Sequence, residues 1–135
     1  MSRYLLDTNI WILLLKRPPD CLPRRLEAER VESIVTCSVV KAELYHGALK
    51  YRGSNKRRES IDSLLAPYFS FPFDDVAARH YGSIRHELES HGHTIGPNDL
   101  KIAAIYLTHG LTLVSSNAGE FGRVAGLNLE DWTTP

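Results

Sequence analysis

Short runs of apolar residues alternate along the chain with longer segments whose apolar positions recur at helical spacing. The short runs are rich in β-branched and aromatic residues and predict buried strands at residues 4–6, 33–37, 69–73 and 111–114, with a short fifth strand at 127–129. The longer segments predict helices at residues 10–16, 22–30, 39–51, 56–66, 76–91 and 97–109. Pro18 and Pro19 end the first helix, and Gly110 closes the last.

Strands that alternate with helices indicate a parallel sheet covered by helices on both faces. We therefore predict an α/β protein, a three-layer α/β/α sandwich with a central parallel sheet, formed by residues 1–135 as one domain. In such sheets ligands bind beyond the carboxyl ends of the strands. Polar residues that directly follow a predicted strand are therefore the first candidates for a functional site.

Two acidic residues have both a structural and a functional interpretation. Asp7 directly follows the first predicted strand, where it could cap the next helix or contribute to a site. Glu43 shares its helix face with Val39, Val40 and Gly47. A carboxylate on that face is costly to bury without a cation or hydrogen-bond donors, unless its stem packs while its head reaches water.

A second group of polar residues belongs to the end of the chain. Asp99 lies in the first turn of helix 97–109, where the helix dipole favours a negative charge, but its face continues through residues 102 and 103 toward the core. Asn98 beside it could hydrogen-bond to a metal ligand. Asn117 and Glu120 follow the fourth strand, in the loop that matches the one holding Asp7; a polar turn explains them equally well.

Ligands that offer only oxygen suit hard cations such as Mg²⁺ or Mn²⁺. No two histidines share a helix face beside a suitable third ligand, no Ser-His-Asp or Cys-His arrangement is evident, and no glycine-rich phosphate loop follows the first strand. The chemistry that is left is metal-assisted hydrolysis of a phosphate ester.

The charge balance changes this picture only locally. Lysine plus arginine and aspartate plus glutamate both number 16, and zero formal charge is not the usual footprint of a nucleic-acid-binding protein. Basic residues nevertheless crowd one short segment: Lys50, Arg52, Lys56, Arg57 and Arg58. The segment is either a solvated helix face or a patch that contacts phosphates. Apolar stretches are too short to span a membrane and the first residues lack a secretory pattern, so we expect a cytoplasmic protein.

Several stretches of the chain, in order, resemble the PIN-domain family and, within it, the VapC toxins. They are Leu5-Leu6-Asp7-Thr8-Asn9, Ala42-Glu43-Leu44, the segment 95–104 with Pro97-Asn98-Asp99, Leu113-Val114-Ser115-Ser116-Asn117, and Glu120-Phe121. The resemblance covers nearly the whole length. It implies a PIN-like α/β/α domain and a Mg²⁺- or Mn²⁺-dependent endoribonuclease, the toxin of a toxin–antitoxin pair, with transfer RNA among the targets that the family uses.

The resemblance also implies roles for individual residues. Asp7, Glu43 and Asp99 are expected to be catalytic metal ligands. The family often has a fourth acid where this chain has Asn117, so Glu120 substitutes, Asn117 acts through a water, or a second metal site is weak. Thr8, Asn9, Asn98 and Ser116 are expected to support the ligands, and the basic segment to hold RNA. The expected partners are an RNA substrate, a cognate antitoxin and a second copy of the chain in a homodimer, without a membrane.

Three other functions compete with this interpretation. An aspartyl-phosphate phosphatase needs a second acid two residues after the first, where this chain has Asn9. A receiver domain needs an acidic pair and a late lysine, and neither is evident. A PIN-like module that binds RNA or protein without cutting is the main alternative; it need not bind Mn²⁺ at all.

Overall fold

The computed structural model describes residues 2–135, in which strands and helices alternate. None of the helices within these residues is long and apolar enough to cross a membrane. The strands are β1 (Tyr4–Leu6), β2 (Ile34–Cys37), β3 (Phe69–Phe71), β4 (Thr112–Val114) and β5 (Leu129–Glu130). The α-helices are α1 (Thr8–Leu15), α2 (Cys21–Ala28), α3 (Ser38–Ala48), α4 (Ser54–Leu65), α5 (Asp75–Ser90), α6 (Pro97–His109) and α7 (Ala118–Phe121), and η1 (Val31–Ser33) is a short 3₁₀ helix.

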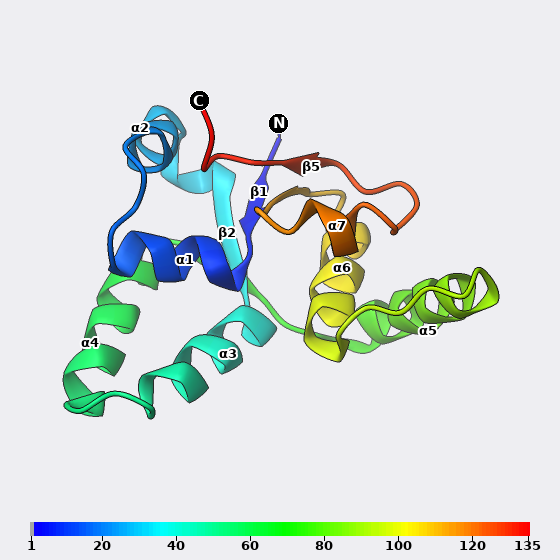
Figure 1. Ribbon diagram of the computed structural model, residues 1–135, viewed down its shortest axis with the longest axis horizontal. Helices are drawn as coiled ribbons and strands as arrows, with labels where there is room; N and C mark the ends of the chain where they lie inside the picture. The colour runs from blue at the N-terminus through cyan, green and yellow to red at the C-terminus, as the bar shows by residue number, and fades with distance from the viewer. Residues whose placement is uncertain (1) are drawn as a thin grey trace.

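The five strands form one parallel sheet in the order β3-β2-β1-β4-β5. Figure 1 shows α1 and α4 on one side of the sheet and α5 and α6 on the other, which confirms the predicted three-layer α/β/α arrangement. The chain leaves β1 toward β2 and returns on the other side of β1 as β4. A crevice is expected at such a change of direction, beyond the carboxyl ends of the strands.

The predicted elements are present, with small shifts at their ends. Helix α6 has the predicted bounds, and β3 ends directly before Pro72, which cannot donate a ladder hydrogen bond. The second strand is one residue shorter than predicted because Ser33 belongs to η1. The last strand, predicted at 127–129, is Leu129–Glu130, so it begins two residues later and ends one residue later than predicted. Buried strands of this kind are recognised by composition more easily than by their exact ends.

Trp11 anchors the first strand to the first helix. Its indole is fully buried, and its Nε1–H donates to the carbonyl oxygen of Leu6 over 3.1 Å. The ring also packs against Tyr68, with centroids 5.4 Å apart. The end of β1 is therefore held in place directly before Asp7.

Helix α3 has a glycine, Gly47, as its second-last residue. Gly47 has no positive φ, and a Cβ built on it would meet no atom within 4 Å. Gly82 in α5 has the same two properties. A glycine inside a helix destabilises it by about 0.5–1 kcal/mol relative to alanine. Neither backbone geometry nor packing within the chain therefore accounts for Gly47.

Candidate active site

The carboxyl ends of β1 and β4 open into a cavity of about 500 Å³, in the crevice that the strand order predicts. Its walls come from the first turn of α1, one face of α3, the start of α6 and the loop after β4. The cavity contains most of the predicted site residues: it is lined by Asp7, Thr8, Asn9, Ile12, Ala42, Glu43, His46, Gly47, Lys50, Asn98, Asp99 and Asn117.

Asp7 both caps a helix and faces the cavity. Its Oδ1 accepts from the backbone N–H of Ile10 over 3.1 Å, which makes it the N-cap of α1. Its Oδ2 accepts from the hydroxyl of Ser115, and its own backbone N–H donates to Val114 over 3.0 Å. Burial raises the pKa of Asp7, while the hydrogen bonds from Ser115 and Ile10 oppose that rise. The carboxylate is thus held rigidly with one edge toward the cavity.

Glu43 reaches the cavity from α3, half-buried as its apolar helix face predicted. Its Oε1 accepts from the hydroxyl of Thr8 over 2.6 Å. Thr8 lies 35 positions earlier in the chain, at the start of α1. This bond links the two helices that carry the first two candidate ligands.

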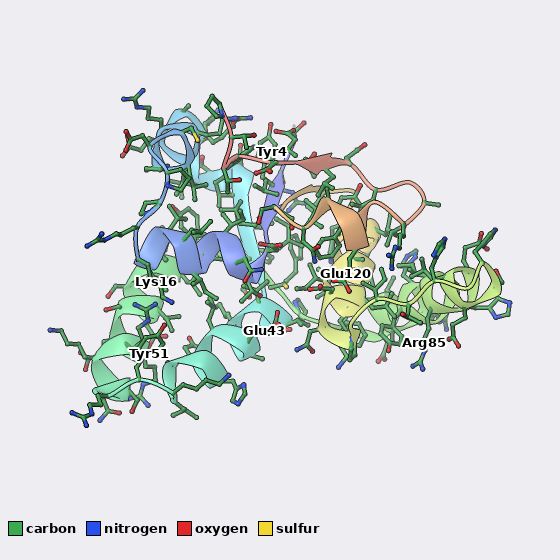
Figure 2. All side chains as sticks on the ribbon, in the orientation of Figure 1. Tyr4, Lys16, Glu43, Tyr51, Arg85 and Glu120 are labelled. Carbon is green, nitrogen blue, oxygen red and sulfur yellow. The ribbon has the colours of Figure 1, made fainter. Side chains whose placement is uncertain are left out.

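Asp99 enters from the first turn of α6, where Asn117 and Glu120 meet it. The amide of Asn117 donates to Glu120 over 2.9 Å and lies 3.5 Å from Asp99. Glu120 also accepts from the backbone N–H of Gly96 over 3.4 Å, and it is outside the set of residues that line the cavity. Figure 2 shows Glu43 and Glu120 approaching the strand ends from different elements, α3 and α7.

The acidic groups in the cavity lack cationic partners. Within residues 2–135, none of Asp7, Glu43 and Asp99 forms a salt bridge. Burial, the hydrogen bond with Glu120 and the charges of neighbouring carboxylates together raise the pKa of Asp99 to about 7. The same contact with Asp99, followed by the bond from Asn117, lowers the pKa of Glu120. The site therefore concentrates negative charge that a cation would relieve.

The donor set of the cavity suits a hard divalent ion, because it offers carboxylate, amide and hydroxyl oxygens. In the part of the chain that the structure describes, however, no group of three histidine, cysteine, aspartate or glutamate side chains is arranged to hold an ion as it stands. The carboxylates line a common space without converging on one point. Their chemistry fits a metal, and an ion held by all of them would have to draw them together.

The pKa of Asp99 predicts how metal-free stability changes with pH. The folded protein keeps a proton on Asp99 up to about pH 7, whereas the ordinary pKa is 3.8, so ionising it as the pH rises costs folding free energy. In EDTA, we expect Asp99→Asn to raise the melting temperature over wild type, by a margin that grows from pH 5 to pH 8. The exposed Asp75→Asn in α5 serves as the control. A margin for Asp99→Asn that does not change with pH would contradict the assigned shift.

The residues predicted to support the ligands are only partly at the cavity, and two residues that were not predicted also contribute to the site. Asn9 and Asn98 line the cavity, but Ser116 is exposed and outside the lining set. The hydroxyl that contacts Asp7 belongs to the fully buried Ser115, which also accepts from the backbone N–H of Asn117 over 2.9 Å. His46, which the sequence does not single out, lines the cavity about one turn beyond Glu43.

The basic segment divides into two parts. Lys50 lines the cavity itself, and Arg57 lines an adjoining groove between α1, α3 and α4. Arg52, Lys56 and Arg58 are exposed and line neither space. Only two of the five predicted RNA-binding residues therefore lie beside the candidate site.

A search against protein-family models matches residues 4–127 to the PIN domain. The chain therefore belongs to the PIN-domain family. Its relatives in that family are VapC ribonucleases. The chain is 38% identical to Ribonuclease VapC2 of Haemophilus influenzae, over 98% of this chain and 99% of the relative. It is 35% identical to the tRNA(fMet)-specific endonuclease VapC of Shigella flexneri, over 98% of this chain and 100% of the relative.

The solved structures agree with this assignment. The structure of VapBC2 from Rickettsia felis, bound to a DNA fragment from their promoter, matches with a TM-score of 0.90 and 34% identity. The match covers 97% of this chain and 99% of that chain. The PIN fold predicted from the sequence is thus confirmed.

Proposed function

We propose that this protein is the toxin of a VapBC-type toxin–antitoxin pair and that it cleaves RNA at the cavity beyond β1 and β4 with the help of Mg²⁺ or Mn²⁺. The observation that carries the proposal is the gathering of Asp7, Glu43 and Asp99 around one cavity, where none of them forms a salt bridge with any residue of the described range 2–135. The ribonuclease names of near full-length relatives support RNA as the substrate.

Asp7, Glu43 and Asp99 are the residues that would hold the ion. Bound there, Mg²⁺ or Mn²⁺ would help to deprotonate a water molecule and neutralise charge on the phosphodiester that this water attacks. The chain's own hydrogen bonds prepare the ligands: Ser115 and Ile10 fix Asp7, and Thr8 fixes Glu43. Such supporting contacts set ligand orientation in metal sites.

The contacts of Asn117 and Glu120 favour supporting roles for both residues. Asn117 places its amide nitrogen between Asp99 and Glu120, and Glu120 accepts the shorter bond. Asn117 thereby orients Asp99, while Glu120 orients Asn117 and contributes to the raised pKa of Asp99. On this account neither residue replaces the fourth acid as a direct ligand.

The relatives suggest a first substrate and a first partner to test. One of them is named a tRNA(fMet)-specific endonuclease, so we propose initiator transfer RNA as the first candidate target. The Rickettsia felis relative was crystallised as VapBC2, so a cognate antitoxin is the expected protein partner of this chain. A homodimer, expected from the family resemblance, remains part of the proposal.

The test is cleavage of initiator transfer RNA by purified, antitoxin-free protein, with elongator methionine transfer RNA as the matched control substrate. We expect discrete fragments in Mg²⁺ or Mn²⁺ and intact RNA when EDTA is added. Total cellular RNA is treated in parallel, so that a different target would be detected. If all RNA stays intact and the folded protein binds no Mn²⁺, the non-catalytic RNA- or protein-binding module replaces the nuclease.

A further inference from the structure

The candidate active site continues into a groove that the proposed chemistry does not use. This groove lies between α1, α3 and α4 and encloses about 150 Å³. It shares Ile12, Glu43, Gly47 and Lys50 with the catalytic cavity, so the two spaces are adjoining parts of one surface depression. A polymer that occupies the cavity can therefore extend along α3 into the groove.

Gly47 lies at the junction of the two spaces. Within residues 2–135, a Cβ at this position would meet no atom within 4 Å apart from its chain neighbours and the nearby backbone of its own helix, and the backbone has no positive φ that would require glycine. The side chain is therefore absent from a place where the protein has room for it and where a helix would be more stable with alanine. Glycine at this position leaves the backbone near the end of α3 open to close approach by a bound molecule.

Tyr51 stands at the far end of the groove with two cationic side chains around it. The ring is 43% exposed, and its centroid lies 4.8 Å from the Arg57 guanidinium carbon and 5.6 Å from the Lys16 ammonium nitrogen. Figure 2 shows Lys16 at the end of α1 and Tyr51 below it, next to α4 in this view. None of Lys16, Lys50 and Arg57 forms a salt bridge within residues 2–135. Lys16 and Arg57 both contact the Tyr51 ring, and an exposed aromatic ring beside an arginine and lysines is suited to stack a base and contact its phosphates.

We propose that this groove is a nucleotide subsite, in which the RNA backbone crosses Gly47 and an unstacked base packs on Tyr51. The proposal rests on the proposed function, since it assigns the groove to the RNA strand that continues from the cleaved phosphate. Glu43 lies in α3 and Lys50 two residues after its end, so the two are seven positions apart, about 10 Å at the helical rise. One or two nucleotides of an extended strand cover that span, so the base on Tyr51 belongs to a near neighbour of the cleaved bond.

The charge and the position of the groove favour RNA as its occupant. Lys16, Lys50 and Arg57 offer positive charge for phosphates, and the groove opens directly into the proposed catalytic cavity. A segment of the antitoxin is the alternative occupant, and it makes a different prediction for the variants below.

The test measures RNA binding and RNA cleavage for Gly47→Ala and Tyr51→Leu, each with a matched control. Gly82→Ala is the control for the first, because Gly82 is also inside a helix with free space around it and lines none of the described cavities. Phe69→Leu is the control for the second, because Phe69 is an exposed aromatic residue on the edge strand β3. Binding is measured in EDTA with a twelve-nucleotide RNA of mixed sequence, and cleavage in Mg²⁺ with initiator transfer RNA.

Gly47→Ala is expected to raise the melting temperature, as Gly82→Ala does, yet to weaken RNA binding several-fold. Opposite effects on stability and binding cannot come from a damaged fold. Tyr51→Leu is expected to weaken binding about tenfold, the loss of one base–aromatic stack. Both controls are expected to bind and cut RNA like wild type.

Equal RNA binding by Gly47→Ala, Tyr51→Leu and wild type would overturn the subsite. Unchanged RNA binding together with weaker neutralisation by the cognate antitoxin would assign the groove to the antitoxin and would also overturn it. A wild-type protein that cuts no RNA would defeat the proposed function instead, and the binding arm in EDTA would still decide the subsite. The two failures are therefore distinguishable.

Discussion

Replacing Asp7 with asparagine is expected to reduce RNA cleavage by more than about 100-fold, because residues that only orient a metal ligand already change affinity or activity by ~10–100-fold. The fold should be unaffected. Asparagine is as good an N-cap as aspartate, so the bond from Ile10 that starts α1 can be kept. What the variant loses is the negative charge next to Glu43 and Asp99, and with it affinity for the cation.

The matched control is Asp74→Asn, the same substitution at the other aspartate that caps a helix. Asp74 caps α5 by accepting from the backbone N–H of Ala77 over 2.9 Å, and it does not line the cavity. Cleavage rates with Mg²⁺ and melting temperatures are measured for both variants. Undiminished cleavage by Asp7→Asn would remove this residue from the proposed ligand set.

Replacing Trp11 with alanine is expected to lower the free energy of unfolding by about 3–5 kcal/mol, the range for removing a buried aromatic side chain. The indole is fully buried and packs on Tyr68, and its loss also leaves the carbonyl oxygen of Leu6 without its donor. Urea unfolding followed by circular dichroism measures the change. Because this carbonyl directly precedes Asp7, reduced activity is expected as well.

Two further substitutions serve as comparisons for Trp11→Ala: one keeps an aromatic ring at position 11, and the other removes an exposed ring elsewhere. Trp11→Phe restores much of the ring but not the hydrogen bond, so it is expected to cost less than alanine. Phe69→Ala removes an aromatic ring that is 62% exposed, and it is expected to change stability by less than about 0.5 kcal/mol. A loss below about 1 kcal/mol for Trp11→Ala would contradict the anchoring role.

The part of the site that depends on backbone topology could be predicted from the sequence. Asp7 and Asn117 follow neighbouring parallel strands, and the rule for carboxyl ends places both at one edge of the sheet. For Asp7, the two interpretations weighed from the sequence proved compatible, because one carboxylate oxygen caps α1 while the other accepts from Ser115. Local pattern alone could not show that Asp7 caps α1 and also lines the cavity, and its role as a metal ligand remains a prediction.

What the sequence did not reveal depends on which way individual side chains point. Ser115 and Ser116 are adjacent and identical, and only the structure shows that Ser115 contacts Asp7 while Ser116 faces solvent. His46 and Gly47 belong to the cavity because of how α3 is rotated against α1 and α6. The basic segment has no regular period across the turn between α3 and α4, so charge density could not separate Lys50 and Arg57 from their exposed neighbours.

The most direct test of the metal-assisted mechanism is the chemical identity of the new ends on cleaved RNA, determined in Mg²⁺ and in EDTA. Attack by water produces ends without a cyclic phosphate, and we expect only such ends, formed only when the divalent ion is present. Attack by the neighbouring 2′-hydroxyl of the RNA would instead leave 2′,3′-cyclic phosphates. Cyclic ends that persist in EDTA would contradict the metal-assisted account and would direct attention to His46 and Lys50 in the same cavity.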